Sequence, residues 1–280
     1  MALTPEQIKQ FNEDGYLILP DFYTHAECDV LRERIQKLIH EQLDLSNHPR
    51  TIFSTSTQTN DNYFLNSGDK IAYFFEEQAF DAAGNLAVPV DKSLNKIGHA
   101  LHELDPDFKK FTTTNKVKEL TRSVGFKRPV VAQSMYIFKQ AGIGGEVVPH
   151  QDSTFLHTSP CTIMGFWVAL ENCDLDNGCL WFVPGSQKDG LHRRFVRDAS
   201  GTGTLFTAPA VMYPDDKFIP GIVQKGGLVL IHGEIIHRSG PNNTSRSRNI
   251  YTWHVMETEN VAYSQDNWLQ PEPKMTLYDA

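Results

Sequence analysis

His150-Gln151-Asp152 is the stretch from which the fold and the chemistry of this chain can be worked out. In an extended strand, alternate side chains point to the same face, so His150 and Asp152 share one face while Gln151 points away. An imidazole nitrogen and a carboxylate oxygen can then reach a common point. Such a pair supplies two of the three ligands of a 2-His-1-carboxylate site, which holds non-heme Fe(II) with open positions. The tripeptide alone equally suits a surface His and Asp at a strand end, so the rest of the chain has to decide.

From residue 130 onward, short apolar and aromatic segments alternate with Gly, Pro and Asn turns. Such regularly spaced turns are typical of a β-barrel or a double-sheet jelly roll and not of alternating strands and helices. The pattern predicts strands over 130–139, 162–170, 179–183, 221–223, 227–232 and 249–257.

The residues before 129 show mainly helical patterns. Thr4 with Gln7, and Thr24 with Glu27, form capping boxes that predict helices beginning at residues 5 and 25. Further helices are predicted over 92–104 and 108–123, and short strands over 16–19 and 70–76. We expect a single domain over 1–280, in which a mainly helical part (1–128) packs on a β-barrel core (129–280).

The third metal ligand has to come from a distant strand, and two histidines qualify. His232 ends a predicted strand, and His237 follows after a short turn. An anionic dicarboxylate cofactor would also need a basic residue, and arginine suits best because its guanidinium meets a carboxylate with two hydrogen bonds. Arg248 lies 248 − 237 = 11 residues after His237, whereas the same offset from His232 leads to Asn243. His237 is therefore favoured as the ligand, and His232 is interpreted as a core or turn residue.

Arg246 competes with Arg248 for the anion, because the two residues have the same strand parity. Arg246 lies nearer the turn at 240–242 and ranks lower.

Composition narrows the class of protein. The 280 residues carry a formal net charge of −8, which disfavours non-specific binding to nucleic acid or anionic lipid. No apolar run approaches the ~18 residues of a membrane span, and the first residues lack the basic and apolar regions of a signal peptide. The four cysteines show no C-x-x-C spacing and are interpreted as reduced thiols. We expect a cytoplasmic monomer that binds neither nucleic acid nor a membrane.

Several further motifs accompany the His150-x-Asp152 tripeptide, His237 and Arg248. They are NGCLWFVPGS at 177–186, DGY at 14–16, SGDKI at 67–71, NKIGHALH at 95–102 and QSMY at 133–136. Together they resemble the phytanoyl-CoA dioxygenase family over most of the chain. The resemblance implies a mostly β fold, a double-stranded β-helix of the jelly-roll type with N-terminal and flanking α-helices. It also implies an oxygenase that depends on Fe(II) and 2-oxoglutarate.

The resemblance further assigns roles to individual residues. His150, Asp152 and His237 would hold the iron. Lys96 would reach a carboxylate of 2-oxoglutarate, Met135, Trp167 and Ser239 would line its pocket, and Arg248 would anchor its distal carboxylate. By residue type alone, Lys96 on a predicted helix suits a solvated position, and Met135 and Trp167 on strands suit plain core. The chain departs from the family pattern at Gln187, where a histidine often follows Pro-Gly-Ser.

We therefore expect a dioxygenase that hydroxylates a small molecule with O2 while 2-oxoglutarate is converted to succinate and CO2. One alternative is a non-catalytic barrel that binds metal and 2-oxoglutarate as a sensor or scaffold, and succinate production separates the two. A halogenase of the same fold is disfavoured, because it needs an open position where Asp152 stands. The sequence does not identify the substrate, and the basic stretch over 109–128 is interpreted as a solvated helix face.

Overall fold

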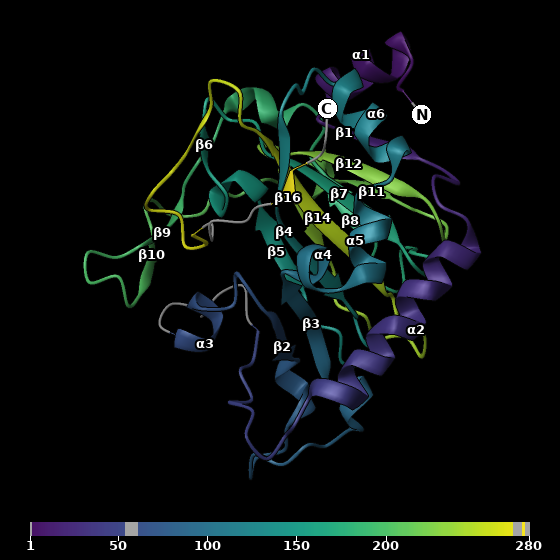
Figure 1. Cartoon of the computed structure of the whole chain (residues 1–280), viewed down its shortest axis with the longest axis vertical. Coiled ribbons are helices and arrows are strands. Elements are labelled where there is room, and N and C mark those ends of the chain that lie inside the picture. Colours follow the sequence, from purple (N-terminus) through teal and green to yellow (C-terminus); the bar gives the residue numbers. More distant parts are fainter. Residues whose placement is uncertain (1, 54–60, 271–275, 278–280) are drawn as a thin grey trace.

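The computed structural model describes residues 2–53, 61–270 and 276–277. Its main element is an antiparallel sheet in which β1, β12, β7, β14, β4, β3 and β2 lie side by side in that order, with β16 paired to β4 (Figure 1). These strands are β1 (Tyr16–Leu19), β2 (Ile71–Phe75), β3 (Leu94–His99), β4 (Pro129–Ile137), β7 (Met164–Ala169), β12 (Leu228–His232), β14 (Ile250–Glu257) and β16 (Thr276–Leu277).

A second, smaller antiparallel sheet has the order β11-β8-β13-β5. Its strands are β5 (Val147–His150), β8 (Leu180–Phe182), β11 (Ile219–Gly221) and β13 (His237–Ser239). Buried side chains of both sheets, such as Trp167 and Ile250 from the large one and Phe182 from the small one, belong to one hydrophobic cluster. The two sheets therefore share a core, and the predicted jelly-roll fold class is confirmed.

Two short strand pairs complete the β structure: β6 (Thr158–Ser159) with β15 (Ala262–Tyr263), and β9 (Phe195–Arg197) with β10 (Thr204–Phe206).

Helices cover the other face of the large sheet. The buried side of α2, which includes Leu31, Ile35 and Leu38, belongs to the same cluster as Phe166 and Trp253 of the sheet. Both capping boxes are present, with Thr4 before α1 and Thr24 before α2. The helices are α1 (Pro5–Asp14), α2 (His25–Gln42), α3 (Asn62–Leu65), α4 (Leu101–Leu104), α5 (Pro106–Thr112) and α6 (Asn115–Ser123). Single 3-10 turns lie at η1 (Glu77–Ala79), η2 (Val90–Lys92), η3 (Asp152–Thr154), η4 (Ser186–Asp189) and η5 (Asp215–Lys217).

The single helix predicted over 92–104 is wrong, because Leu94–His99 form strand β3 and only Leu101–Leu104 are helical, as the short helix α4. β3 pairs with β2 on one side and with β4 on the other, and nearly all of its residues are buried. Apolar side chains on both faces of a buried strand can imitate helical spacing. Gly98 allows the close approach of β4, since a Cβ at this position would lie 3.0 Å from Met135 Cγ. Lys96 consequently lies on a strand, and not on a solvated helix.

Other boundaries differ by less. The helix predicted over 108–123 is divided into α5 and α6, because Thr114 is extended and acts as the N-cap of α6. The strand predicted over 221–223 lies instead at β11 and pairs with β8. The part before residue 129 is rich in helices, yet it contributes β1, β2 and β3 to the large sheet. Within the ranges described above, no helix is both long and apolar enough to cross a lipid bilayer.

Candidate metal centre and cavity

The two histidines of the predicted metal site face each other on neighbouring strands. His150 ends β5, His237 begins β13, and the two residues are directly paired in the small sheet. Asp152 follows at the start of η3. Its Oδ1 atom lies 3.6 Å from Nε2 of His150 and 3.6 Å from Nε2 of His237. One potential ligand atom from each residue lies within 4.8 Å of the others, so the geometry brings together the three residues that the sequence proposed.

Backbone carbonyls orient both imidazole rings. Nδ1 of His150 lies 2.9 Å from the carbonyl oxygen of Val148, and Nδ1 of His237 lies 3.1 Å from that of Ile235. A carbonyl oxygen only accepts, so each Nδ1 carries a proton, and this arrangement directs each Nε2 toward the position of a metal. Burial, reinforced by the neighbouring His150, lowers the pKa of His237 to about 4, so this ring is neutral near pH 7.

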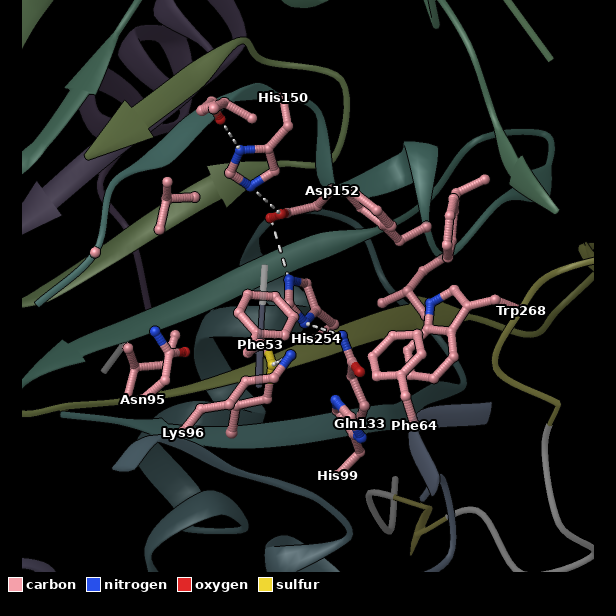
Figure 2. A pocket seen from close by; sticks show the side chains of 18 of the residues that line it. Phe53, Phe64, Asn95, Lys96, His99, Gln133, His150, Asp152, His254 and Trp268 are labelled. Atoms are coloured by element: carbon pink, nitrogen blue, oxygen red, sulfur yellow. Dashed lines mark hydrogen bonds and ion pairs between the residues drawn. The ribbon is translucent and has the colours of Figure 1, made fainter. Parts of the chain in front are cut away.

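A further histidine, which the sequence analysis did not select, holds the carboxylate. Nε2 of His254, on β14, lies 3.1 Å from Oδ2 of Asp152. The side-chain amide of Gln133 lies 3.3 Å from Nδ1 of His254, so Gln133 donates to His254 and His254 donates to Asp152 (Figure 2). Burial raises the pKa of Asp152, but His254 and His237 outweigh it and hold this pKa well below its ordinary value. The carboxylate is thus anionic, with Oδ1 directed to the two ligand histidines.

The sequence contains a feature that could have selected His254 for the site. It shares strand parity with Arg248, and residues of one parity on a strand point to one face. Gly165, on the adjacent strand β7, leaves the room that the carboxylate needs, because a Cβ there would lie 3.1 Å from Oδ2 of Asp152.

The metal centre opens into a cavity of about 160 Å³ between the two sheets. His150 and Asp152 line it together with His254 and Lys96 (Figure 2). Met135 also lines it. The other lining residues are Phe53, Phe64, Glu76, Asn95, His99, Gln133, Ile137, Lys139, Gly145, Val147, Val148, Phe155, Leu156, Arg193, Phe195, Phe206 and Trp268.

Lys96 is buried in this cavity without a carboxylate partner among the described residues. Its Nζ lies 3.4 Å from the ring centre of Phe53 and 3.8 Å from Sδ of Met135. Burial lowers the pKa of Lys96 well below its ordinary value. A bound anion would restore the charged form, which makes Lys96 a suitable contact for a carboxylate.

Trp167, Ser239 and Arg248 lie behind the cavity wall and do not line it directly. The guanidinium of Arg248 lies 5.3 Å from the Trp167 ring centre, and the Ser239 hydroxyl donates to the carbonyl of Gly178. Lys139, a lining residue, contacts two of them: its carbonyl accepts from the Arg248 backbone N–H, and its Nζ lies 3.5 Å from the Ser239 carbonyl.

Arg248 is an unusual buried cation. Only 2% of it is exposed, and its Nε and Nη1 atoms have no hydrogen-bond partner among the described residues. Arg246 differs, because it is half exposed and pairs with Asp174 at 2.9 Å. His232 also lies outside the metal centre, where its Nδ1 accepts from the backbone N–H of Glu234.

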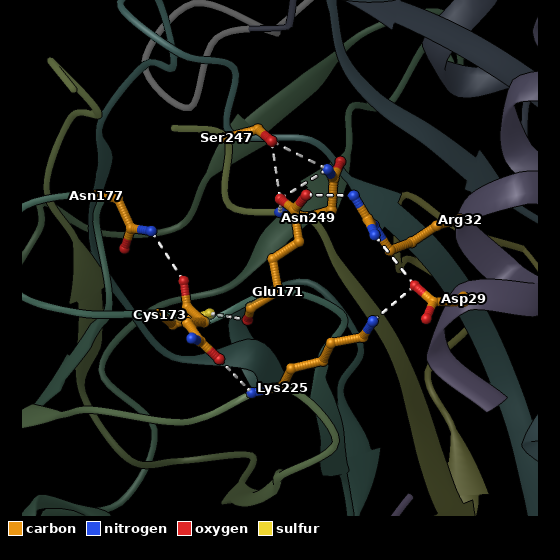
Figure 3. Close-up of polar contacts among 9 residues, drawn as sticks. Asp29, Arg32, Glu171, Cys173, Asn177, Lys225, Ser247 and Asn249 are labelled. Atoms are coloured by element: carbon orange, nitrogen blue, oxygen red, sulfur yellow. Dashed lines mark hydrogen bonds and ion pairs between the residues drawn. The ribbon is translucent and has the colours of Figure 1, made fainter. Parts of the chain in front are cut away.

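A cluster of charged and polar residues holds the backbone on both sides of Arg248. One carboxylate oxygen of Glu171 accepts from the Ser247 hydroxyl at 2.8 Å and from the Asn249 backbone N–H at 2.9 Å. The other oxygen accepts from Arg32 on α2 at 2.7 Å. Asp29 then joins Arg32 to Lys225 (Figure 3). We call these six residues, Asp29, Arg32, Glu171, Lys225, Ser247 and Asn249, the Glu171 cluster.

Gln187, the departure from the family pattern, has a structural role. Its side-chain amide donates to the backbone carbonyls of Asn12 and Glu13 and so ties η4 to the end of α1.

A model of the phytanoyl-CoA dioxygenase family matches residues 11–250, a range that contains all three metal-site residues. The chain belongs to the phytanoyl-CoA dioxygenase family. It is 50% identical over 278 residues to phytanoyl-CoA dioxygenase domain-containing protein 1 of Danio rerio, covering 96% of this chain and 95% of that protein. It is 48% identical over 282 residues to a protein named phytanoyl-CoA dioxygenase of Arabidopsis thaliana, covering 99% and 98%.

A solved structure shares the fold of this phytanoyl-CoA dioxygenase family member. It is the epimerase SnoN from a complex with Fe3+, alpha ketoglutarate and nogalamycin RO, with a TM-score of 0.64 and 15% identity over 96% of this chain and 89% of that one.

The residues of this family member fit Fe(II) and 2-oxoglutarate. Two imidazole nitrogens and one carboxylate form the ligand set that suits non-heme Fe(II). The unpartnered guanidinium nitrogens of Arg248 and the unpaired ammonium of Lys96 suit a dicarboxylate, because a buried charge requires a partner of opposite sign.

Proposed function

We propose that this protein is an oxygenase that uses Fe(II), 2-oxoglutarate and O2 to hydroxylate a small molecule. The observation that carries the proposal is the arrangement of His150, Asp152 and His237, whose potential ligand atoms converge at the wall of a cavity. The bound iron would supply the oxidising chemistry, with 2-oxoglutarate converted to succinate and CO2.

The chain's own residues would orient and protect this centre. The carbonyls of Val148 and Ile235 keep the protons of His150 and His237 on Nδ1. His254 holds one oxygen of Asp152 and leaves the other for the metal. Lys96 and Arg248 are proposed to bind the two carboxylates of 2-oxoglutarate, with Met135, Trp167 and Ser239 forming the surroundings. Preorganised contacts of this kind need no rearrangement during the reaction.

The test is succinate formation from 2-oxoglutarate by the Fe(II)-loaded protein. It is measured with and without a panel of acyl-CoAs, free acids and cell extract, and Asp152→Ala is the inactive control. We expect succinate above the control level and an increase when the substrate is present. Binding of iron and 2-oxoglutarate with no succinate under any condition would instead support the sensor or scaffold alternative.

We further propose that phytanoyl-CoA is not the preferred substrate. Its several CoA phosphates would need a cluster of free cations near the cavity, but the basic stretch over 109–128 lies on the helical side, and no residue of it lines the cavity. Several of its lysines already face acids: Lys109 is 3.3 Å from Glu103, and Lys127 is 2.7 Å from Glu259.

Succinate and hydroxylated product are therefore compared at saturating phytanoyl-CoA. We expect slow succinate formation with little hydroxylated product. One-to-one formation of both at a rate on the order of the ~10 s⁻¹ typical of enzymes would contradict this proposal.

A further inference from the structure

Arg193 differs from the next two arginines in the chain, Arg194 and Arg197. Arg194 pairs with Asp266, and Arg197 donates to the backbone carbonyls of Trp268 and Leu65. Arg193 has neither an ion pair nor a hydrogen bond to any described residue, although it lines the cavity. Its guanidinium instead stacks over the Phe206 ring, 3.9 Å from the ring centre. A partly buried cation that lacks an acid is therefore available to a ligand.

The cavity wall around Arg193 is aromatic. Phe206 lies against Phe195, with ring centres 4.9 Å apart, and both rings contact Phe155. Phe155 in turn lies 6.1 Å from the ring of the metal-site residue His150. A continuous aromatic surface thus runs from the metal centre to the guanidinium. Such a surface binds an apolar group by excluding water and by ring stacking.

A second unpartnered donor lies on the same wall. Trp268 is stacked on Phe64 at 4.2 Å and is only 2% exposed. Its indole Nε1 has no hydrogen-bond partner among the described residues. Because a buried N–H without a partner is costly, an acceptor on a ligand would compensate for it.

We propose that the cavity takes a substrate with an apolar body and one carboxylate, in which Arg193 binds the carboxylate and the aromatic wall binds the body. The inference rests on the proposed oxygenase function and specifies its substrate class. A carboxylate is favoured because the planar guanidinium can meet it with two parallel hydrogen bonds. An uncharged molecule of the same shape would leave the cation without a partner.

The experiment compares two probes of nearly equal shape, 4-phenylbutanoate and its uncharged amide, 4-phenylbutanamide. Each is titrated calorimetrically, without oxygen, into protein that already holds Fe(II) and saturating 2-oxoglutarate, so that the probe cannot bind in place of the cofactor. We expect the acid to bind about tenfold or more tightly than the amide, as a charged hydrogen-bonded contact implies.

Three variants assign the preference to Arg193. Arg193→Gln should bind the acid and the amide equally, and Arg193→Lys should keep part of the preference. Arg238→Gln is the matched control, because Arg238 also stacks on a phenylalanine, Phe218, at 3.9 Å but pairs with Asp215 and does not line the cavity. This control should retain the full preference of the unaltered protein.

The inference is overturned if the acid does not bind, if the amide binds equally well to the unaltered protein, or if Arg193→Gln keeps the preference. Iron and 2-oxoglutarate are titrated separately in each variant. If the unaltered protein binds both cofactors normally but does not prefer the acid, the substrate class alone is refuted, whereas failure of the unaltered protein to bind the cofactors refutes the proposed function.

Discussion

In the Glu171 cluster the charged side chains face opposite charges, whereas Lys96 and Arg193, two of the cations that line the cavity, face aromatic rings. Both regions contain at least one charge that is largely removed from bulk water, Glu171 in the cluster and Lys96 in the cavity, and burying a charge costs free energy unless a partner offsets it. In the Glu171 cluster the partners are part of the chain, so the charges join α2 to the start of β14. For Lys96 and Arg193, no described residue supplies an acidic partner, so a ligand can take that place. The comparison distinguishes charges that stabilise the fold from charges that are proposed to bind a substrate or cofactor.

The largest expected effect is at the metal centre. Asp152→Ala removes the anionic ligand of the proposed site, so iron binding should be strongly weakened and succinate formation abolished. The fold should persist, because the Glu171 cluster is untouched. Iron content, succinate formation and circular dichroism check this result. His232→Ala serves as the control and should stay active, whereas an inactive His232 variant beside an active His237→Ala would mean that the third ligand is misassigned.

Arg248 lies between Ser247 and Asn249 of the Glu171 cluster, but its own guanidinium is proposed to bind 2-oxoglutarate. Truncating a buried, doubly hydrogen-bonded charge typically costs about 2–5 kcal/mol. Arg248→Ala should therefore weaken 2-oxoglutarate binding roughly 30-fold or more, with much less effect on iron. Calorimetric titration at constant iron measures both. Arg246→Ala, which breaks only a partly exposed pair with Asp174, is the control, and equal losses at the two positions would contradict the assignment.

Variants of His254 and Gln133 test whether the hydrogen bonds that lead to Asp152 affect metal binding. Replacing a residue that orients a ligand typically costs about 10- to 100-fold in metal affinity or activity. His254→Phe keeps an aromatic side chain but removes the N–H that donates to Asp152. Iron affinity should therefore fall by a factor within that range. Gln133→Leu, one contact further from the metal, should show a smaller loss. Unchanged iron affinity in His254→Phe would show that the contact has no such role.

The smallest effect on ligand binding is expected from the Glu171 cluster. Glu171→Gln keeps the shape of the side chain but removes its charge, which should lower the free energy of unfolding by about 2 kcal/mol. The affinity for 2-oxoglutarate should fall only a few-fold, because Arg248 itself remains. Urea unfolding and calorimetry measure the two quantities. Glu13→Gln on exposed α1 is the control, with a change within about 0.5 kcal/mol, and a large loss of affinity without loss of stability would place Glu171 in the ligand site.

The sequence predicted the features that depend on local spacing or on motif resemblance. The shared face of His150 and Asp152 follows from strand geometry, and the strands after residue 130 follow from the spacing of apolar segments and turns. It failed at β3, because a strand buried on both faces carries no alternating pattern. That error also gave Lys96 the wrong local structure, although the family resemblance still selected it for the site.

The contacts made over long sequence separations could not be predicted in the same way. His254 of the large sheet approaches Asp152, which follows a strand of the small sheet. Glu171 reaches the residues around Arg248 because β7 and β14 pair in the large sheet. Local spacing carries no information about such pairing. Contacts between residues that are distant in sequence depend on the order of strands in the sheets, which the sequence patterns did not specify.

The direct pairing of His150 with His237 across β5 and β13 has a consequence for how such proteins diversify. The separation of the two imidazoles is set by the hydrogen bonding of the sheet and not by the length of chain between them. Insertions and deletions in the loops between β5 and β13, outside Asp152 and the paired strand β8, therefore need not change the separation of the two histidines. Residues such as Phe155, Arg193 and Phe206 lie in that intervening chain. Descendants of one ancestor can thus acquire new substrates by remodelling this region while they inherit an unchanged oxidising centre.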